Sequence, residues 1–117
     1  MFSSIFIYPV PRSRMDEFLR IHGEALKIYR EFGAIDDVTY RPIDVGAKYG
    51  CVGFDSTIEL RGDEIVCVSV SFFRNRAHHD EVMKKIDNDP RIDALYERIQ
   101  KVIDIRRIAR GEFERAV

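Results

Sequence analysis

The sequence predicts an α+β fold in which helices cover one face of a ferredoxin-like antiparallel sheet. Its patterns follow the order strand, helix, three strands, helices and strand, which is a split βαβ arrangement. The longest helix pattern is amphipathic with a broad apolar face, as expected for a helix that packs on a sheet. A chain of 117 residues, 45% of them hydrophobic, is predicted to form a single domain over residues 1–117 that needs no metal or disulfide.

The first strand and the first helix are predicted from composition and from the residues that bound them. Residues 2–8 are rich in Phe, Ile and Tyr and end at Pro9, which favours a strand of that extent. Ser13 and Asp16 have capping-box form, and Gly33 is a typical stop signal. We therefore expect a helix of about 20 residues between them, close to 30 Å long.

The middle of the chain is expected to supply three strands. Residues 35–41 alternate loosely between apolar and polar side chains and form the first of these strands. A loop with three glycines follows at 42–53, then a second strand at 54–60 and a turn at 61–63.

The clearest strand pattern lies at residues 64–73. Three valines and Phe72 fall on one face, while Cys67, Ser69 and Ser71 fall on the other face between two larger apolar residues. We expect this smaller, partly polar face to point away from the helices.

The last third of the chain is predicted to hold two helices and a final strand. Asn75 is placed to cap one helix, and Asp89 followed by Pro90 opens the next, with the residue types preferred at the cap and first positions. Residues 105–116 read as the last strand, in which Gly111 marks a bulge.

A sheet covered on one side leaves its second face bare, and exposed strand surface of this kind associates readily. We therefore expect a homodimer in which a second copy covers that face. The net charge of −1, from 19 Lys and Arg against 20 Asp and Glu, lets two copies approach without strong repulsion. The same balance argues against general binding to nucleic acid or to an anionic membrane.

The two cysteines and the N-terminus predict the compartment. Cys51 and Cys67 do not make a disulfide framework and are expected to be free thiols. The first residues lack a signal-peptide pattern, and no apolar run approaches the length of a membrane span. These features predict a cytoplasmic protein.

Five short motifs, in order and almost without gaps, carry a resemblance to a known family. They are Tyr8-Pro9-Val10-Pro11-Arg12, Arg30-Glu31-Phe32-Gly33-Ala34-Ile35, Arg76-Ala77-His78-His79-Asp80, Asn88-Asp89-Pro90-Arg91-Ile92, and Asp104-Ile105-Arg106-Arg107 with Gly111-Glu112-Phe113-Glu114. The chain resembles the YbaA-like family, a domain of unknown function in the dimeric α+β barrel superfamily. It departs from the family pattern at Val70, where that pattern carries Trp, and at His79, where it carries a basic residue.

The resemblance implies a homodimer whose two sheets form a barrel, but it implies no particular reaction. Relatives in the wider superfamily include cofactor-independent monooxygenases, lactone isomerases and haem degraders. The haem degraders use a set of Asn, Trp and His, and this chain contains no Trp.

His78 and Asp80 are the candidate catalytic residues, because an imidazole that titrates near neutral pH beside charged groups can move a proton. The alternative, which we favour, places them with Arg76 in the first turns of a helix in purely electrostatic or solvated roles. His78 and His79 lie about 100° apart on a helix and cannot close on one metal ion. No metal site is predicted.

Ser69, Ser71, Arg76 and Arg107 are the candidate ligand-binding residues. Small hydroxyl side chains on the bare sheet face would leave room in the barrel for a ligand, and Arg107 would supply a cation for a carboxylate. The alternative is that these residues pack across a dimer interface with no cavity. His22, on the apolar face of the first helix, is expected to be a packed histidine rather than a base or a haem ligand.

Taken together, the residues and the resemblance predict a small homodimeric protein that binds a small metabolite in the barrel interior, as a cofactor-independent monooxygenase or isomerase. The alternative is a non-catalytic binding or stress-associated dimer with no pocket. No cofactor is predicted, because the chain lacks a nucleotide-binding glycine loop, a G-x-S-x-G elbow and zinc-spaced Cys and His residues.

Overall fold

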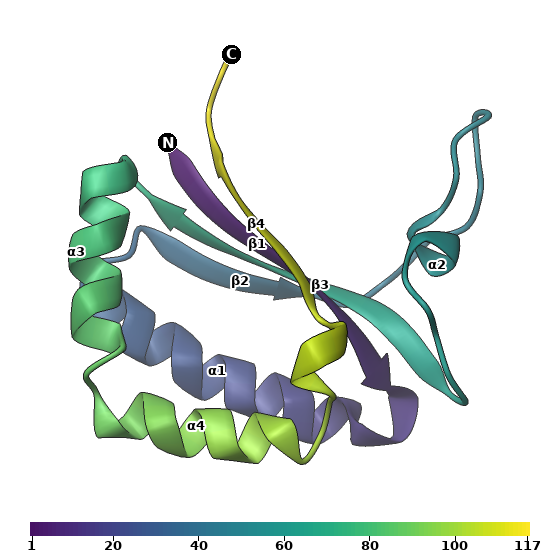
Figure 1. Cartoon of the computed structure of the whole chain (residues 1–117), viewed down its shortest axis with the longest axis horizontal. Helices are drawn as coiled ribbons and strands as arrows, with labels where there is room; N and C mark the ends of the chain where they lie inside the picture. Colours follow the sequence, from purple (N-terminus) through teal and green to yellow (C-terminus); the bar gives the residue numbers. More distant parts are fainter.

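The computed structural model describes residues 1–117 and shows a four-stranded antiparallel sheet with helices packed on one face (Figure 1). The strands are β1 (Phe2–Pro11), β2 (Asp36–Tyr40), β3 (Glu64–Phe73) and β4 (Ala109–Glu114). They lie in the order β2-β3-β1-β4, so the two longest strands occupy the centre. This order confirms the predicted ferredoxin-like α+β class.

Three helices form the second layer: α1 (Met15–Glu31), α3 (Arg76–Ile86) and α4 (Pro90–Gln100). The predicted caps of the last two helices are confirmed, because the Asn75 and Asp89 side chains each accept a backbone N–H from the first turn. None of these helices combines the length and the apolar character that crossing a membrane requires.

The start of α1 differs from the prediction. Residues Arg12–Arg14 form a 3-10 turn, α1 begins at Met15, and no side chain caps it. The backbone N–H of Ser13 donates to Oδ2 of Asp63 at 3.0 Å, which ties Ser13 to the turn before β3. The capping role predicted for Ser13 is therefore wrong.

The first strand continues past Pro9 to Pro11. The backbone N–H of Arg12 donates to the carbonyl of Asp63 on the β3 side, so even-numbered β1 residues direct their N–H groups toward β3. Pro9 and Pro11 have the other parity, and their ring nitrogens face the β4 side, where pairing has already ended at Ile7. Both prolines therefore fit without the loss of a ladder hydrogen bond.

Residues 54–60 do not form a strand. Phe54–Thr57 make one helical turn, α2, in which the hydroxyls of Ser56 and Thr57 donate to the carbonyls of Gly53 and Phe54. Local bonds of this kind compete with strand pairing. The predicted last strand also shortens, because Ile105–Arg107 form a 3-10 turn, and unbroken pairing with β1 leaves no bulge at Gly111.

The two faces of β3 are the reverse of the prediction. Cys67 packs in the main core with Phe18 and Ile21 of α1, so its face, which includes Ser69 and Ser71, points toward the helices. No helix covers the opposite face, where Val68 and Val70 are partly exposed, although Val66 at the start of the strand is buried. The prediction was wrong because the partners that make the serines suitable for the interior come from β1 and β2, which the pattern of one strand does not reveal.

Candidate functional site

A pocket of about 330 Å³ lies between the sheet and the helices α1 and α4. Eleven of its 13 lining residues are hydrophobic, and the volume lies within the range of small-molecule sites. Its walls come from β1, α1, α4 and the segment that leads into β4. The other two large hollows have linings in which only 4 of 8 and 6 of 10 residues are hydrophobic, so this pocket is the best candidate for an apolar ligand.

The periodicities of the sequence bring the pocket together. Alternation along β1 places Phe6 and Tyr8 on the helix-facing side of the sheet. On α1, His22 and Tyr29 are two turns apart and share a face with Ala25, whose small side chain lies between them. The missing volume at Ala25 leaves room in the layer between sheet and helices.

Tyr8 is a buried, neutral polar group in the pocket wall. Its hydroxyl shares a hydrogen bond of 2.7 Å with Oγ of Ser69. Burial raises the pKa of the Tyr8 phenol well above its usual value. The phenol therefore stays protonated and serves as a fixed hydrogen-bonding group.

His22 is a packed histidine, as expected, and it also lines the pocket. Its ring does pack on Phe18 and Tyr8, with centroids 4.3 and 5.2 Å apart, and its Nδ1 lies 3.1 Å from Oγ1 of Thr39. Its Nε2 makes no hydrogen bond within the chain. Burial lowers the pKa of His22 to about 4, so the imidazole is neutral at physiological pH and serves as a hydrogen-bonding group rather than a strong base.

A second polar pair lies in the same interlayer space. The hydroxyl of Ser71 donates to Oδ1 of Asp37 at 2.7 Å, and both residues are buried. Burial raises the pKa of Asp37 to about 6. Burial and the nearby charge of Asp37 also raise the pKa of Tyr29 above its usual value. Ser69 and Ser71 are thus engaged by protein partners, and neither lines the pocket.

Arg110 is the only residue of the pocket lining with a permanent charge. It lies opposite Phe6 in the β1–β4 ladder, and its guanidinium carbon is 5.8 Å from the centre of the Phe6 ring. One amino group, Nη2, contacts Glu112 at 2.9 Å. The side chain is half exposed, so its remaining donors are accessible to a ligand.

The predicted catalytic pair is not formed. Nδ1 of His78 accepts the backbone N–H of Arg74 at 3.0 Å, while the Asp80 carboxylate lies 2.8 Å from Nδ1 of His79. Arg76 is exposed at the start of α3. These residues lie outside the pocket, and their contacts are those of a helix terminus.

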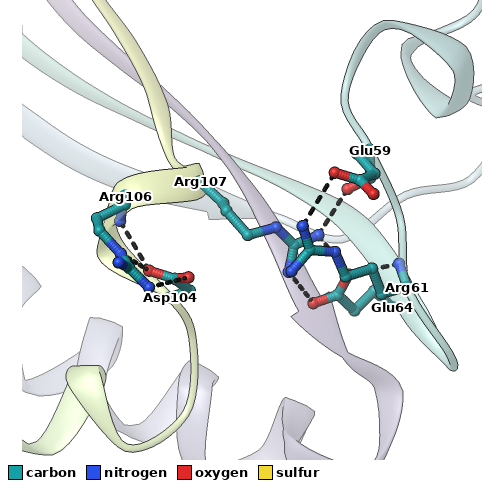
Figure 2. Close-up of polar contacts among 6 residues, drawn as sticks. All are labelled: Glu59, Arg61, Glu64, Asp104, Arg106 and Arg107. Atoms are coloured by element: carbon teal, nitrogen blue, oxygen red, sulfur yellow. Dashed lines mark hydrogen bonds and ion pairs between the residues drawn. The ribbon is translucent and has the colours of Figure 1, made fainter.

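Arg107 is already saturated by protein groups, as Figure 2 shows. Its two amino groups contact the Glu64 carboxylate at 2.7 Å each, and one also donates to the Glu59 carbonyl at 2.7 Å. It does not line the pocket. Arg110, three residues further along the chain, does line the pocket.

Tyr8, Tyr29 and Arg110 line the pocket but were not among the functional candidates, while His22 was considered and assigned a packing role. The signal for Tyr8, His22 and Tyr29 was present, since alternation in β1 and the spacing along α1 place their rings on buried faces. The sequence did not indicate that the buried faces of β1 and α1 leave a pocket between them. No group of three or more His, Cys, Asp or Glu side chains is arranged to hold a metal ion.

Comparisons with known proteins place this geometry in context. Residues 1–102 match the family described as "Protein of unknown function (DUF1428)". A NIPSNAP domain protein from Burkholderia xenovorans has a similar structure, with a TM-score of 0.63, 14% identity and coverage of 100% of this chain and 96% of that one. A NIPSNAP family protein from Agrobacterium tumefaciens is also similar, with a TM-score of 0.61 and 14% identity. The match covers 98% of this chain and 85% of that one. At this identity the likeness concerns the fold alone, and no curated protein matches the chain.

Proposed function

The chain belongs to the DUF1428 family, whose function is unknown, and from its pocket and its bare sheet face we propose that it is a homodimeric, cytoplasmic protein that binds a small, largely apolar metabolite. The same features suit the YbaA-like proteins of the dimeric α+β barrel superfamily that its motifs resemble. The site we propose is the pocket between sheet and helices, not the space between the two sheets of the dimer.

One observation carries the proposal: a hollow of about 330 Å³, partly open to solvent, lies between the sheet and the helices and is lined mainly by apolar side chains. Small-molecule sites are typically concave and mostly apolar, with a few polar groups that orient the ligand. Tyr8 and His22 at the wall can orient a polar group of the ligand. This pocket favours ligand binding over the alternative of a dimer with no pocket.

Arg110 indicates that the ligand carries an acidic group. A guanidinium offers five N–H donors in a planar fork that suits a carboxylate, and the Glu112 contact uses only one of its amino groups. No carboxylate lines the pocket. An apolar or aromatic carboxylate would place its body between α1 and α4 and its charge beside Arg110.

A thermal-shift screen with aryl and alkyl carboxylates tests whether the pocket binds a ligand. A ligand of the native state should raise the melting temperature by several degrees through mass action. The Ala25→Leu variant fills the pocket and should abolish the shift, whereas Ala94→Leu on the exposed side of α4 should retain it. An equal shift in both variants would place the ligand elsewhere.

Arg110→Gln tests the acidic group. It should weaken binding of a carboxylate about tenfold, since a charge-assisted hydrogen bond is lost, and leave binding of the corresponding neutral amide unchanged. Arg106→Gln is the matched control, because Arg106 contacts only Asp104 and lies outside this pocket. Equal losses for acid and amide would remove Arg110 from ligand recognition.

Ligand binding is the function that this site supports best, because His22 is a weak base. Burial lowers its pKa to about 4, so the unpartnered Nε2 can orient a polar group of the ligand but takes a proton from carbon poorly at neutral pH. An isomerisation or a cofactor-independent monooxygenation would need a stronger base, and the monooxygenation would need dioxygen in addition. His22→Gln should weaken ligand binding and leave exchange of the ligand's acidic C–H with deuterated solvent unchanged; rapid exchange that is lost in this variant would show instead that His22 acts as a base.

The bare sheet face supports the proposed homodimer. Apart from Ser3, the side chains along the middle of this face are apolar on all four strands: Ile5, Ile7, Val38, Tyr40, Val68, Val70, Phe72 and Phe113. The charged residues of this face, Asp36 and Glu64, lie at the ends of their strands. A face without central charge is complementary to itself, as the two-fold interface of a homodimer requires.

A further inference from the structure

The chain between β2 and β3 forms an arm that stands away from the rest of the molecule. This arm, residues 42–60, leaves the end of β2, includes α2, and returns to the start of β3 (Figure 1). Figure 1 shows that it extends beyond the sheet on the side opposite the helices. The arm therefore rises at the margin of the bare sheet face.

The arm has a defined conformation at its tip. Lys48 and Cys51 exchange two backbone hydrogen bonds, of 3.2 and 2.9 Å, around a two-residue turn. Both central residues, Tyr49 and Gly50, have positive φ angles of 56° and 77°, as in the turns that close tight hairpins. A non-glycine residue is uncommon in this region of backbone space, so the turn is a specific local structure rather than a loose loop.

The base of the arm is equally well defined. The backbone N–H of Asp55 donates to the carbonyl of Val45 at 3.1 Å and joins the two limbs. At Gly53, an added Cβ would lie 2.1 Å from that same carbonyl, so only glycine permits the two limbs to approach this closely.

This defined arm carries large apolar side chains that touch little of their own chain. Ile43 is 95% exposed, Tyr49 90% and Val52 75%. Isolated apolar residues on a surface are ordinary, but several on one projecting element indicate a contact surface. Tyr40, an exposed residue of the bare sheet face, lies at the end of β2 just before the arm begins.

We infer that the arm clasps the flank of a second copy of this chain, so that each protomer of the proposed homodimer gives one arm and receives one. This inference rests on the homodimer proposed above. A two-fold axis through the sheet-to-sheet contact makes the exchange reciprocal. An arm that rises on the bare side of its own sheet reaches the molecule that covers that side, which makes the second copy the occupant.

A double variant tests the contribution of the arm to the dimer separately from that of the sheet face. Ile43→Ser with Tyr49→Ser removes the two most exposed apolar side chains of the arm and leaves the sheet face intact. We expect the dissociation constant of the dimer, measured by sedimentation equilibrium, to rise about tenfold or more, since buried apolar anchors dominate interfaces. Ile35→Ser with Tyr96→Ser, at exposed positions outside the arm and the bare face, should leave it unchanged.

Cys51 provides a second measurement on the natural sequence. It is exposed in the arm, whereas Cys67 is buried, so a thiol reagent reports on the arm alone. Its labelling should slow several-fold above the dimer dissociation constant. If the double variant still forms the dimer and Cys51 is labelled at the same rate in monomer and dimer, the proposed arm contact is wrong but the homodimer stands. A natural chain that sediments as a monomer overturns both.

Discussion

Asp37 is a buried carboxylic acid that faces the helix layer. Burial raises its pKa to about 6, with a further rise from Asp36, while the Ser71 hydrogen bond and Arg30 oppose the shift. The folded chain therefore holds this proton more tightly than the unfolded chain does. The stability that protonated Asp37 contributes is full below about pH 4 and is lost as the pH rises through 6.

The variant Asp37→Asn should remove this pH dependence, because the amide oxygen still accepts from Ser71 and carries no charge. We expect the variant to gain stability relative to the natural chain between pH 4.5 and 7.5, by about 1–3 kcal/mol. Urea denaturation at the two pH values measures the gain. A difference that does not change with pH would show that Asp37 is not desolvated.

Protonation of His22 has the opposite effect on the stability of the fold. Its pKa is lowered to about 4 by burial, so the folded chain resists a proton that the unfolded chain accepts near its usual value of 6.5. Its contribution to stability is present above pH 6.5 and is lost as the pH falls through 4. In a pH titration followed by NMR, the ring signals of His22 should move only near pH 4; a midpoint near 6.5 would mean that the ring is open to water.

At the scale of the helices, the two predicted caps of α1 and α3 provide a contrast. Asn75 accepts the backbone N–H of His78 at 2.8 Å, so Asn75→Ala should cost about 1 kcal/mol. Ser13→Ala should leave the free energy of unfolding unchanged, because the Ser13 side chain caps nothing. Chemical denaturation of the two variants makes the comparison, and an equal cost would restore the cap predicted at Ser13.

Arg107 joins three elements that are distant in sequence: the end of the arm, the start of β3 and the turn before β4 (Figure 2). The side chains of Arg107 and Glu64 are only 16% and 10% exposed. Arg107→Gln should therefore cost about 1–2 kcal/mol, between the effects of surface and buried pairs. Arg106→Gln, at an 89% exposed side chain, should have no measurable effect in the same urea titration.

The comparison of sequence with structure is clearest at this scale. The helices, the caps at Asn75 and Asp89 and the long strands follow from local signals and are confirmed. Residues 54–60 were assigned to a strand because their composition is compatible with one, but local hydroxyl bonds set a helical turn there. The faces of β3 were reversed because burial of a serine depends on a partner from another strand, which no local pattern contains.

At the scale of the whole molecule, the bare face is the feature that the sequence did predict, although it assigned the wrong side chains to it. Val70 lies near the middle of that face, and Val70→Lys should convert the proposed dimer to a monomer in sedimentation at micromolar concentration. Ala94→Lys on the outer side of α4 should not. If both variants sediment alike, the sheet face is not the interface.

The pocket could not be predicted from the sequence, for a reason that also belongs to this scale. Its wall combines β1, α1, α4 and the entry to β4, so it depends on how far apart the layers stand. Periodicity reveals which side chains are buried but not the spacing between packed elements. The resemblance indicated the ferredoxin-like fold, and it implied a ligand in the barrel interior, whereas this pocket lies on the helix side of the sheet.

The position of β1 in the sheet has a consequence for how the protein is made. Its ladder to β4 pairs Phe2 with Glu114 and Ile7 with Ala109, so the N-terminal strand must wait for nearly the whole chain before its second edge is satisfied. Such long-range pairing slows folding, to roughly milliseconds or longer. A nascent chain can assemble α1 and the β1–β3 pair during synthesis, but the wall that carries Arg110 closes last. The pocket should therefore form only after β4 has been synthesised and has paired with β1.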